Sequence, residues 1–172
     1  EMFSQSFTMN GVLYLMDGKT YRAVRKSSKN TAWEAVPVSG TAYVPTTTIS
    51  AAPTGSGTSY EAVNLLTPKR INTFIGDGTA TQFKVDATDL DETAVTAEVN
   101  GSAVTVSAVN RSTGLITLAA APANGNGLAN VSIAFAKTVS GYADKINKCR
   151  FAGLYGGKND TRVFLSGNPD EP

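Results

Sequence analysis

The sequence predicts a mainly β protein whose centre is a small antiparallel sandwich over residues 73–137. Apolar and polar residues alternate there in short runs, and Gly, Asn and Asp turn signals separate the runs every eight to twelve residues or so. Charged residues make up only 17% of the chain, as suits a β protein with a polar, weakly ionic surface. Together these features predict an Ig-like β-sandwich inserted between N- and C-terminal β-hairpins.

The N-terminal region, residues 1–72, begins with a predicted hairpin and a third strand. Asp-Gly is a strong hairpin turn because its residues tolerate positive φ. The strands flank it and resemble part of a meander or of a propeller blade. The predicted segments are Val12–Met16, the turn Asp17-Gly18, Thr20–Val24 and Trp33–Val38.

Residues 39–72 are predicted to be an extended connector. Pro45, Pro53 and Pro68 interrupt them, and proline cannot donate to a sheet ladder, which disfavours central strands. The segment Tyr60–Leu66 is the one stretch that fits a helical turn.

The sandwich itself is delimited by turn residues. Asn-Gly suits tight hairpin turns, and the segment Thr88–Thr93 fits either a loop or a single helical turn. The predicted turns are Gly76-Asp77-Gly78, Asn100-Gly101, Ser112-Thr113-Gly114 and Asn124–Gly127.

Residues 138–172 are predicted to form a second hairpin. Its strands are Ile146–Tyr155 and Thr161–Leu165, on either side of the turn Gly156–Asp160. The order of the two hairpins suggests that this region packs with residues 1–38 and that the sandwich is an insertion between them.

The composition argues against nucleic-acid binding, membrane insertion and most kinds of catalysis. Fifteen basic and fourteen acidic residues give a net charge of +1, which provides no electrostatic footprint for nucleic acid or an anionic membrane. No apolar run approaches the roughly 18 residues of a membrane span. Histidine is absent, so a Ser-His-Asp arrangement is impossible, and the single cysteine, Cys149, is expected to be a core residue. We therefore expect no enzyme activity, no cofactor and no metal.

Two motifs resemble ligand sites without matching them. Gly153–Asn159 resembles a phosphate loop, but Ala152 stands where the first glycine belongs and Asn159 follows the lysine. An acidic segment lacks the spacing and glycine of an EF-hand, so a solvated loop is favoured over a surface calcium site. Its members are Asp86, Asp89, Asp91 and Glu92.

Candidate interface residues are Arg25, Lys26 and Trp33, because Trp and Arg are enriched at binding hot spots. The alternative is a packed Trp beside a solvated basic loop. The aromatic residues could also line a carbohydrate platform, although core or interface packing is favoured. These aromatics are Tyr14, Tyr21, Trp33, Tyr43, Tyr60, Tyr142 and Tyr155.

Three groups of segments, over roughly residues 10–170, share a pattern with a known class of proteins. The groups are Tyr43–Thr47 with Pro53–Leu66; Phe74–Thr81 with Val99–Gly101 and Gly114–Thr117; and Asp160–Pro169. Together they resemble structural proteins of tailed bacteriophages and of prophages of gut bacteria. The G-D-G-T, V-N-G and G-x-I-T pattern in the second group is shared by sandwich modules of tail and fibre proteins. In such proteins further blades follow the last group, and the resemblance therefore implies that this chain is a piece of a longer one.

The resemblance implies a non-enzymatic tail component that is made in the bacterial host cytoplasm and resides in the virion. Its partners would be other virion proteins or copies of itself, not nucleic acid or membrane, and it has no catalytic residues to transfer. The alternative is an adhesin module of a phage fibre or bacterial surface protein that binds a glycan receptor. Its binding loops would be Thr88–Thr93 and Asn124–Gly127.

Overall fold

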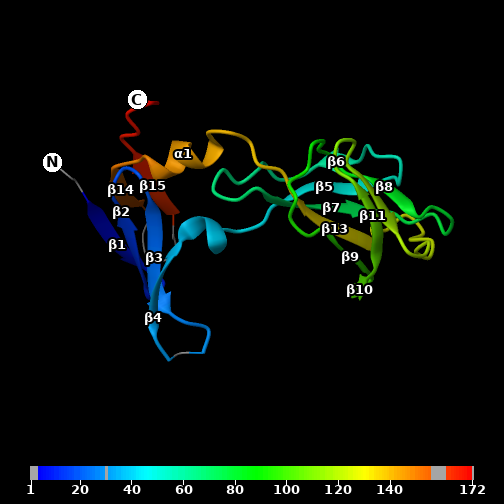
Figure 1. The fold of residues 1–172 in the computed structure, drawn as a ribbon, viewed down its shortest axis with the longest axis horizontal. Coiled ribbons are helices and arrows are strands. Elements are labelled where there is room, and N and C mark those ends of the chain that lie inside the picture. The colour runs from blue at the N-terminus through cyan, green and yellow to red at the C-terminus, as the bar shows by residue number, and fades with distance from the viewer. Residues whose placement is uncertain (1–3, 30, 156–161, 172) are drawn as a thin grey trace. The chain divides into compact units, whose positions relative to one another are not determined.

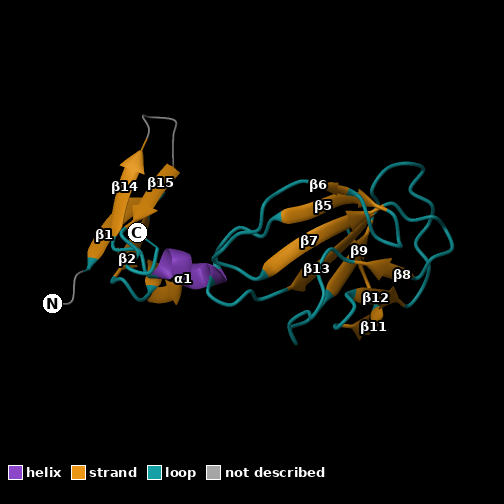
Figure 2. Cartoon of the chain, turned by 90° about the horizontal axis from the view of Figure 1, so that it is seen from above, coloured by secondary structure: helices purple, strands orange, loops and turns teal. Residues whose placement is uncertain are grey.

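The computed structural model describes residues 4–29, 31–155 and 162–171, and the prediction of a mainly β protein is confirmed. Figures 1 and 2 show the strands and the short helix α1 (Tyr142–Asn147). The chain divides into two compact units. The terminal unit comprises residues 1–42, 65–67 and 140–172, and the sandwich unit comprises residues 43–64 and 68–139.

The sandwich unit contains a six-stranded sheet and a three-stranded sheet. The strand orders are β10-β9-β13-β7-β5-β6 and β11-β12-β8. All pairs are antiparallel except β5 with β7, which is parallel, so the larger sheet is mixed. The strands are β5 (Thr46–Ala51), β6 (Thr58–Ser59), β7 (Lys69–Phe74), β8 (Gln82–Lys84), β9 (Thr96–Val99), β10 (Ser102–Val104), β11 (Val106–Asn110), β12 (Leu115–Leu118) and β13 (Val131–Ala136).

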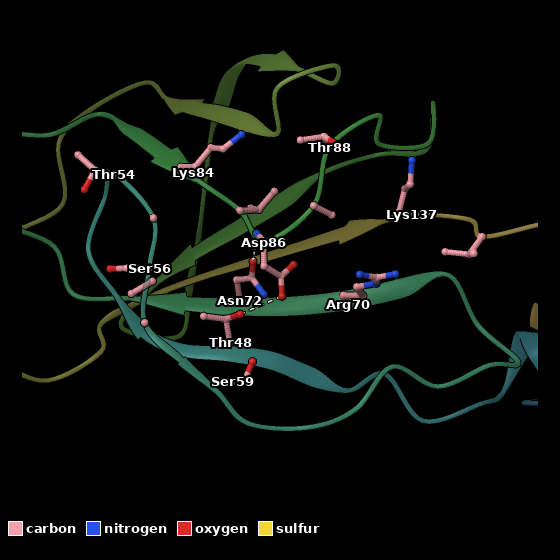
Figure 3. Close-up of a pocket in the computed structure, with 16 residues that line it drawn as sticks. Thr48, Thr54, Ser56, Ser59, Arg70, Asn72, Lys84, Asp86, Thr88 and Lys137 are labelled. Carbon is pink, nitrogen blue, oxygen red and sulfur yellow. Dashed lines mark hydrogen bonds between the residues drawn. The ribbon is translucent and has the colours of Figure 1, made fainter.

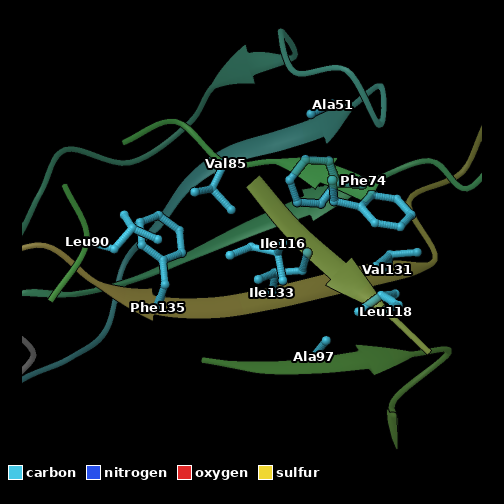
Figure 4. Packing of buried hydrophobic residues seen from close by; sticks show 11 residues of the cluster. Ala51, Phe74, Val85, Leu90, Ala97, Ile116, Leu118, Val131, Ile133 and Phe135 are labelled. Atoms are coloured by element: carbon cyan, nitrogen blue, oxygen red, sulfur yellow. The ribbon is translucent and has the colours of Figure 1, made fainter. Parts of the chain in front are cut away.

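Apolar side chains from both sheets form the core of the sandwich unit (Figure 4). Phe74 of β7 meets Phe83 of β8 edge to face, with ring centroids 5.4 Å apart. The alternation seen in the sequence places these residues inward, as a half-buried sheet face requires. The buried members are Ala51, Phe74, Phe83, Val85, Leu90, Ala97, Ile116, Leu118, Val131, Ile133 and Phe135.

The predicted connector over residues 39–72 is wrong, because β5 and β7 are interior strands of the larger sheet. Pro45, Pro53 and Pro68 lie just outside the strand ends, where the ladder requires no N–H from them. Their carbonyl oxygens accept hydrogen bonds from Ile71, Lys84 and Lys137, respectively. The sandwich therefore begins near Tyr43, and the helical turn expected at Tyr60–Leu66 is absent from this fully described stretch.

The terminal unit contains a four-stranded antiparallel sheet of order β1-β2-β3-β4, followed by a short 3₁₀ helix. The predicted hairpin forms, with Asp17 accepting hydrogen bonds from the N–H groups of Lys19 and Thr20, which lower the pKa of its carboxyl group. The sequence analysis missed β1, although Asn10-Gly11 adopts positive φ in a two-residue turn before β2. The elements are β1 (Gln5–Met9), β2 (Val12–Met16), β3 (Tyr21–Lys26), β4 (Trp33–Pro37) and η1 (Val38–Gly40).

The C-terminal region contains the predicted hairpin, β14 (Phe151–Tyr155) with β15 (Arg162–Ser166), preceded by a helix, α1 (Tyr142–Asn147). The expected strand at Ile146 is therefore wrong in its first part. A contact distant in sequence explains the difference: the Asn168 amide donates to the carbonyl oxygens of Asp144 and Lys145 at the helix end. The predicted turn at Gly156–Asp160 lies outside the described residues.

The sheet and the C-terminal hairpin share one core. Met16, Tyr21, Ala23, Val38 and Cys149 are buried together there. The Gln5 side chain also bonds the backbone of Ala152 at its N–H and its carbonyl oxygen, over 2.6 and 3.1 Å, and so joins β1 to β14. Cys149 is a core residue as predicted, although it follows α1 rather than lying in a strand, and burial raises the pKa of its thiol.

Alkaline pH is expected to destabilise the terminal unit through Tyr21. Burial, with a smaller contribution from Tyr14, raises the pKa of Tyr21 from 10.0 to about 12. The folded protein therefore keeps this proton where the unfolded chain loses it, so stability is undiminished below pH 10 and declines as the pH rises towards 12. Thermal melts between pH 9 and 12 should show a steeper loss for the wild type than for Tyr21→Phe; equal slopes would contradict the assignment.

Candidate functional site

The structure brings together two of the three predicted interface residues. Lys26 and Trp33 are directly paired across β3 and β4, with the Lys26 ammonium 5.9 Å from the centre of the Trp33 ring. Trp33 is 67% exposed, so it is not a packed core residue. Arg25 alternates to the opposite face and forms an ion pair of 3.0 Å with Glu34.

The face of the sheet that carries Trp33 is largely apolar. Leu13, Val24 and Ala35 are cross-strand partners in one row over β2, β3 and β4, and Leu15 follows two residues after Leu13 on the same face. Both leucines are exposed. The face therefore offers apolar side chains beside two cations, Lys26 and Arg22, and β4 forms the edge of this sheet.

A second exposed aromatic group lies on the C-terminal hairpin. The rings of Tyr155 and Phe164 meet edge to face at 5.4 Å, and the guanidinium of Arg162 lies 5.5 Å from the centre of the Tyr155 ring. Phe151 packs its ring against Gly167, which has a φ of +75°. The sequence segment S-G-N-P thus supports this surface as well as the end of α1.

The aromatic residues considered for a carbohydrate platform are divided between the two units. Tyr14 and Tyr21 lie with Phe7 in an aromatic cluster that packs against the core of the terminal unit. Tyr43 belongs to the sandwich unit, where its hydroxyl donates to the Glu61 carboxylate; this bond raises the pKa of Tyr43. Core packing is therefore confirmed for Tyr14 and Tyr21, whereas Trp33, Tyr43, Tyr60 and Tyr155 are exposed.

The acidic residues of the Asp86–Glu92 segment bind separate partners. Asp89 lies 4.0 Å from Lys137, Asp91 accepts from the N–H and hydroxyl of Thr138, and Glu92 pairs with Arg111 at 2.9 Å. The segment Thr88–Thr93 is a loop, one of the two predicted alternatives. Across the described residues, no cluster of three or more His, Cys, Asp or Glu side chains could hold a metal ion.

A polar pocket of about 740 Å³ lies on the inner face of the six-stranded sheet (Figure 3). Residues Arg70, Asn72 and Phe74 alternate along β7 and project to this face. Phe74 lies in the core beneath the three-stranded sheet, whereas Asn72 and Arg70 line the pocket together with Thr48 and Ser59 of the adjacent strands. The pocket therefore lies beside the hydrophobic core, on the same face of the six-stranded sheet. We call it the Asp86 pocket.

Hydrogen bonds hold Asp86 in this pocket. Its Oδ2 accepts from the hydroxyls of Thr47 and Thr48 at 2.6 and 2.9 Å, and its N–H donates to Asn72 Oδ1 at 2.8 Å. The Asn72 amide donates to Thr47 at 3.0 Å, closing the network. Asn72 is only 1% exposed, so its polar groups need these partners. Figure 3 shows Asp86 and Asn72 directed towards each other.

A bulge in β5 explains how neighbouring threonines reach the same carboxylate. Thr46 pairs with Ile71 and Thr48 with Asn72, so β5 uses two residues where β7 uses one. The extra residue, Thr47, redirects its side chain, as bulges do, and both hydroxyls reach Asp86. Local sequence patterns give no signal for such a register shift, and the sequence analysis missed this site.

Of the two loops predicted for binding, each contributes to a pocket of the sandwich unit. Thr88 lines the Asp86 pocket, together with Arg70, Lys84 and Lys137. Asn124 lines a second hollow of about 900 Å³, which also includes Asp77. There the N–H groups of Ala80 and Thr79 bond the Asp77 carboxylate and lower its pKa.

No helix in the described part of the chain is long and apolar enough to span a membrane. No protein-family model, curated protein or solved structure matches this chain.

Proposed function

We propose that this chain is a non-enzymatic structural protein of a tailed-phage virion, a component of the tail, and that it acts through assembly contacts of its terminal unit. The observation that carries the proposal is the uneven distribution of exposed large apolar side chains. Seven of the ten such residues in the described chain belong to the terminal unit, and three to the sandwich unit. The seven are Leu13, Leu15, Trp33, Phe151, Leu154, Tyr155 and Phe164.

Single exposed apolar residues are common on proteins, but a contiguous apolar face marks an interaction surface. Here Leu13 and Trp33 lie on one sheet face, with Val24 and Ala35 between them. Trp33 supplies an aromatic side chain of the kind that is enriched in protein interfaces, and the Lys26 ammonium lies against its ring. The edge strand β4 adds backbone groups that another strand can pair with. Partners would be other virion proteins or copies of this chain.

The proposal is tested by complementation in a host that carries the gene. The gene is deleted from the phage genome, and the wild-type protein is supplied from a plasmid. Virions produced by this strain should contain the wild-type protein, as measured by mass spectrometry of purified particles. Leu13→Glu should fold, as circular dichroism checks, yet be depleted at least tenfold from particles, because a buried unpaired carboxylate opposes docking.

The matched control is Leu128→Glu, the same change at a residue of the sandwich unit that is 75% exposed. It should be incorporated like the wild type. Absence of the wild-type protein from purified particles would overturn the virion assignment. Equal incorporation of both variants would overturn the role of the apolar face.

A further inference from the structure

We propose that the Asp86 pocket of the sandwich unit binds an acidic saccharide, recognising both its hydroxyl groups and its carboxylate. The pocket lies within one compact unit, so it is formed by residues 43–64 and 68–139 alone. The inference does not depend on the proposed role of the terminal unit in assembly.

The charges that line the pocket favour an anionic ligand. Arg70, Lys84 and Lys137 line it, whereas Asp86 is the only acidic residue among the described lining residues. Lys137 already donates to the carbonyl oxygen of Asp89 at 2.9 Å. Arg70 and Lys84 form no side-chain ion pair within the described ranges, so their donors remain available to a carboxylate.

The Asp86 carboxylate favours a ligand that also carries hydroxyl groups. Its Oδ2 is held by Thr47 and Thr48, while its Oδ1 has no partner among the residues that the structure describes. An ionised carboxylate oxygen accepts hydrogen bonds and repels bare anions. A sugar hydroxyl can donate to it, and the hydroxyls of Ser59 and Thr88, which also line the pocket, can donate or accept.

The dimensions and lining of the pocket fit a short oligosaccharide. Its volume of about 740 Å³ lies within the range of small-ligand sites, roughly 300–1,000 Å³. Its mouth is open, so sugar units on either side of the bound one could extend into solvent. Among the described residues that line it, no aromatic ring is present, so polar contacts rather than stacking would provide the specificity.

The Asp86 network could instead serve only to hold the segment after β8 against the larger sheet. That role requires Thr47, Asn72 and Asp86, which bond one another. It does not require the cationic groups of Arg70 and Lys84. Variants of these two residues therefore separate a binding site from a purely structural network.

The experiment is an NMR titration in which each probe is added to the isotopically labelled full chain and the amide chemical shifts of the chain are recorded. The acidic probes are trigalacturonate, a hyaluronan tetrasaccharide and sialyllactose; the neutral probe is a galactose trisaccharide; and inorganic phosphate tests the charge alone. At least one acidic probe should shift the amides of Thr48, Ser59 and residues 84–88, and bind at least tenfold more tightly than the galactose trisaccharide and phosphate.

The double variant Arg70→Gln with Lys84→Gln should weaken binding of that probe at least tenfold. The control Lys69→Gln makes the same charge change one residue away on β7, where alternation directs the side chain to the other face, and should leave the affinity within twofold. Asp86→Asn should weaken saccharide binding and strengthen phosphate binding. Thermal melts establish that each variant is folded.

Three results would each overturn the inference. In the first, no acidic probe shifts the pocket amides. In the second, phosphate or the galactose trisaccharide binds as tightly as the best acidic saccharide, which removes the need for joint recognition of hydroxyl and carboxylate. In the third, the folded double variant binds like the wild type.

Discussion

Replacing Phe74 with alanine is expected to lower the free energy of unfolding of the sandwich unit by about 3–5 kcal/mol. The Phe74 side chain is fully buried and meets Phe83 edge to face. Its strand, β7, is paired with β13 over six residue pairs, so the backbone cannot easily collapse into the space that the ring leaves. Lost apolar burial and the remaining cavity therefore add together.

The measurement is urea denaturation of the full chain, with hydrogen exchange at β13 amides to report on the sandwich unit. Leu128→Ala is the control, because it removes a large apolar side chain that is already 75% exposed. Its stability should stay within about 0.5 kcal/mol of the wild type. A loss below 1 kcal/mol for Phe74→Ala would contradict the assignment of Phe74 to a tightly packed core.

Gly114→Ala is expected to destabilise the same unit by about 2–4 kcal/mol. Gly114 has a φ of +69°, which disfavours any residue with a Cβ. A Cβ at this position would also overlap the carbonyl oxygen of Ala87, which is backbone and cannot rotate away. The Gly114 carbonyl accepts from Val85 N–H at 2.9 Å, so a shift of this turn would disturb the pairing beside the core.

The variant Gly101→Ala separates the cost of the positive φ from the cost of the steric overlap. Gly101 also has a positive φ, of +75°, but a Cβ there would meet no atom within 4 Å. Its substitution should cost only about 1 kcal/mol, from the backbone conformation alone. Melting temperatures and urea midpoints of the two variants give the comparison; equal losses would show that the clash at Ala87 is relieved without strain.

The strands that the sequence predicts best are those whose patterns are local. Val131–Ala136 carries its large apolar residues at every second position, and Asn100-Gly101 forms a turn with φ values of +50° and +75°. The prediction was wrong at β5 and β7 because of their neighbouring prolines. In the sequence alone, a proline just outside a strand end cannot be distinguished from a proline that would interrupt the strand. The helix α1 depends on a contact from Asn168, which is 24 residues from its partner Asp144 and which a local pattern cannot reveal.

The candidate sites differ in the same way. The pairing of Lys26 with Trp33 follows from two adjacent strands, so the sequence suggests both residues. The Asp86 pocket combines residues from β5, β7 and the segment after β8, and it depends on a bulge at Thr47. A register shift of one residue is set by packing of the whole sheet, and for that reason the acidic segment alone predicted only a solvated loop or a calcium site.

The division of the chain has a consequence for the order of events during synthesis. The sandwich unit lies entirely within residues 43–139, so all of its strands have been synthesised before residues 140–172 are made. The terminal unit, by contrast, needs both ends of the chain. The hydrogen bonds between Gln5 and Ala152, for example, cannot form until Ala152 has been synthesised. A sandwich that folds first replaces a long flexible loop by a compact spacer and lowers the entropy cost of bringing the two ends together. The core of the terminal unit is then completed last, because Met16, Tyr21 and Ala23 of the early strands are buried together with Cys149.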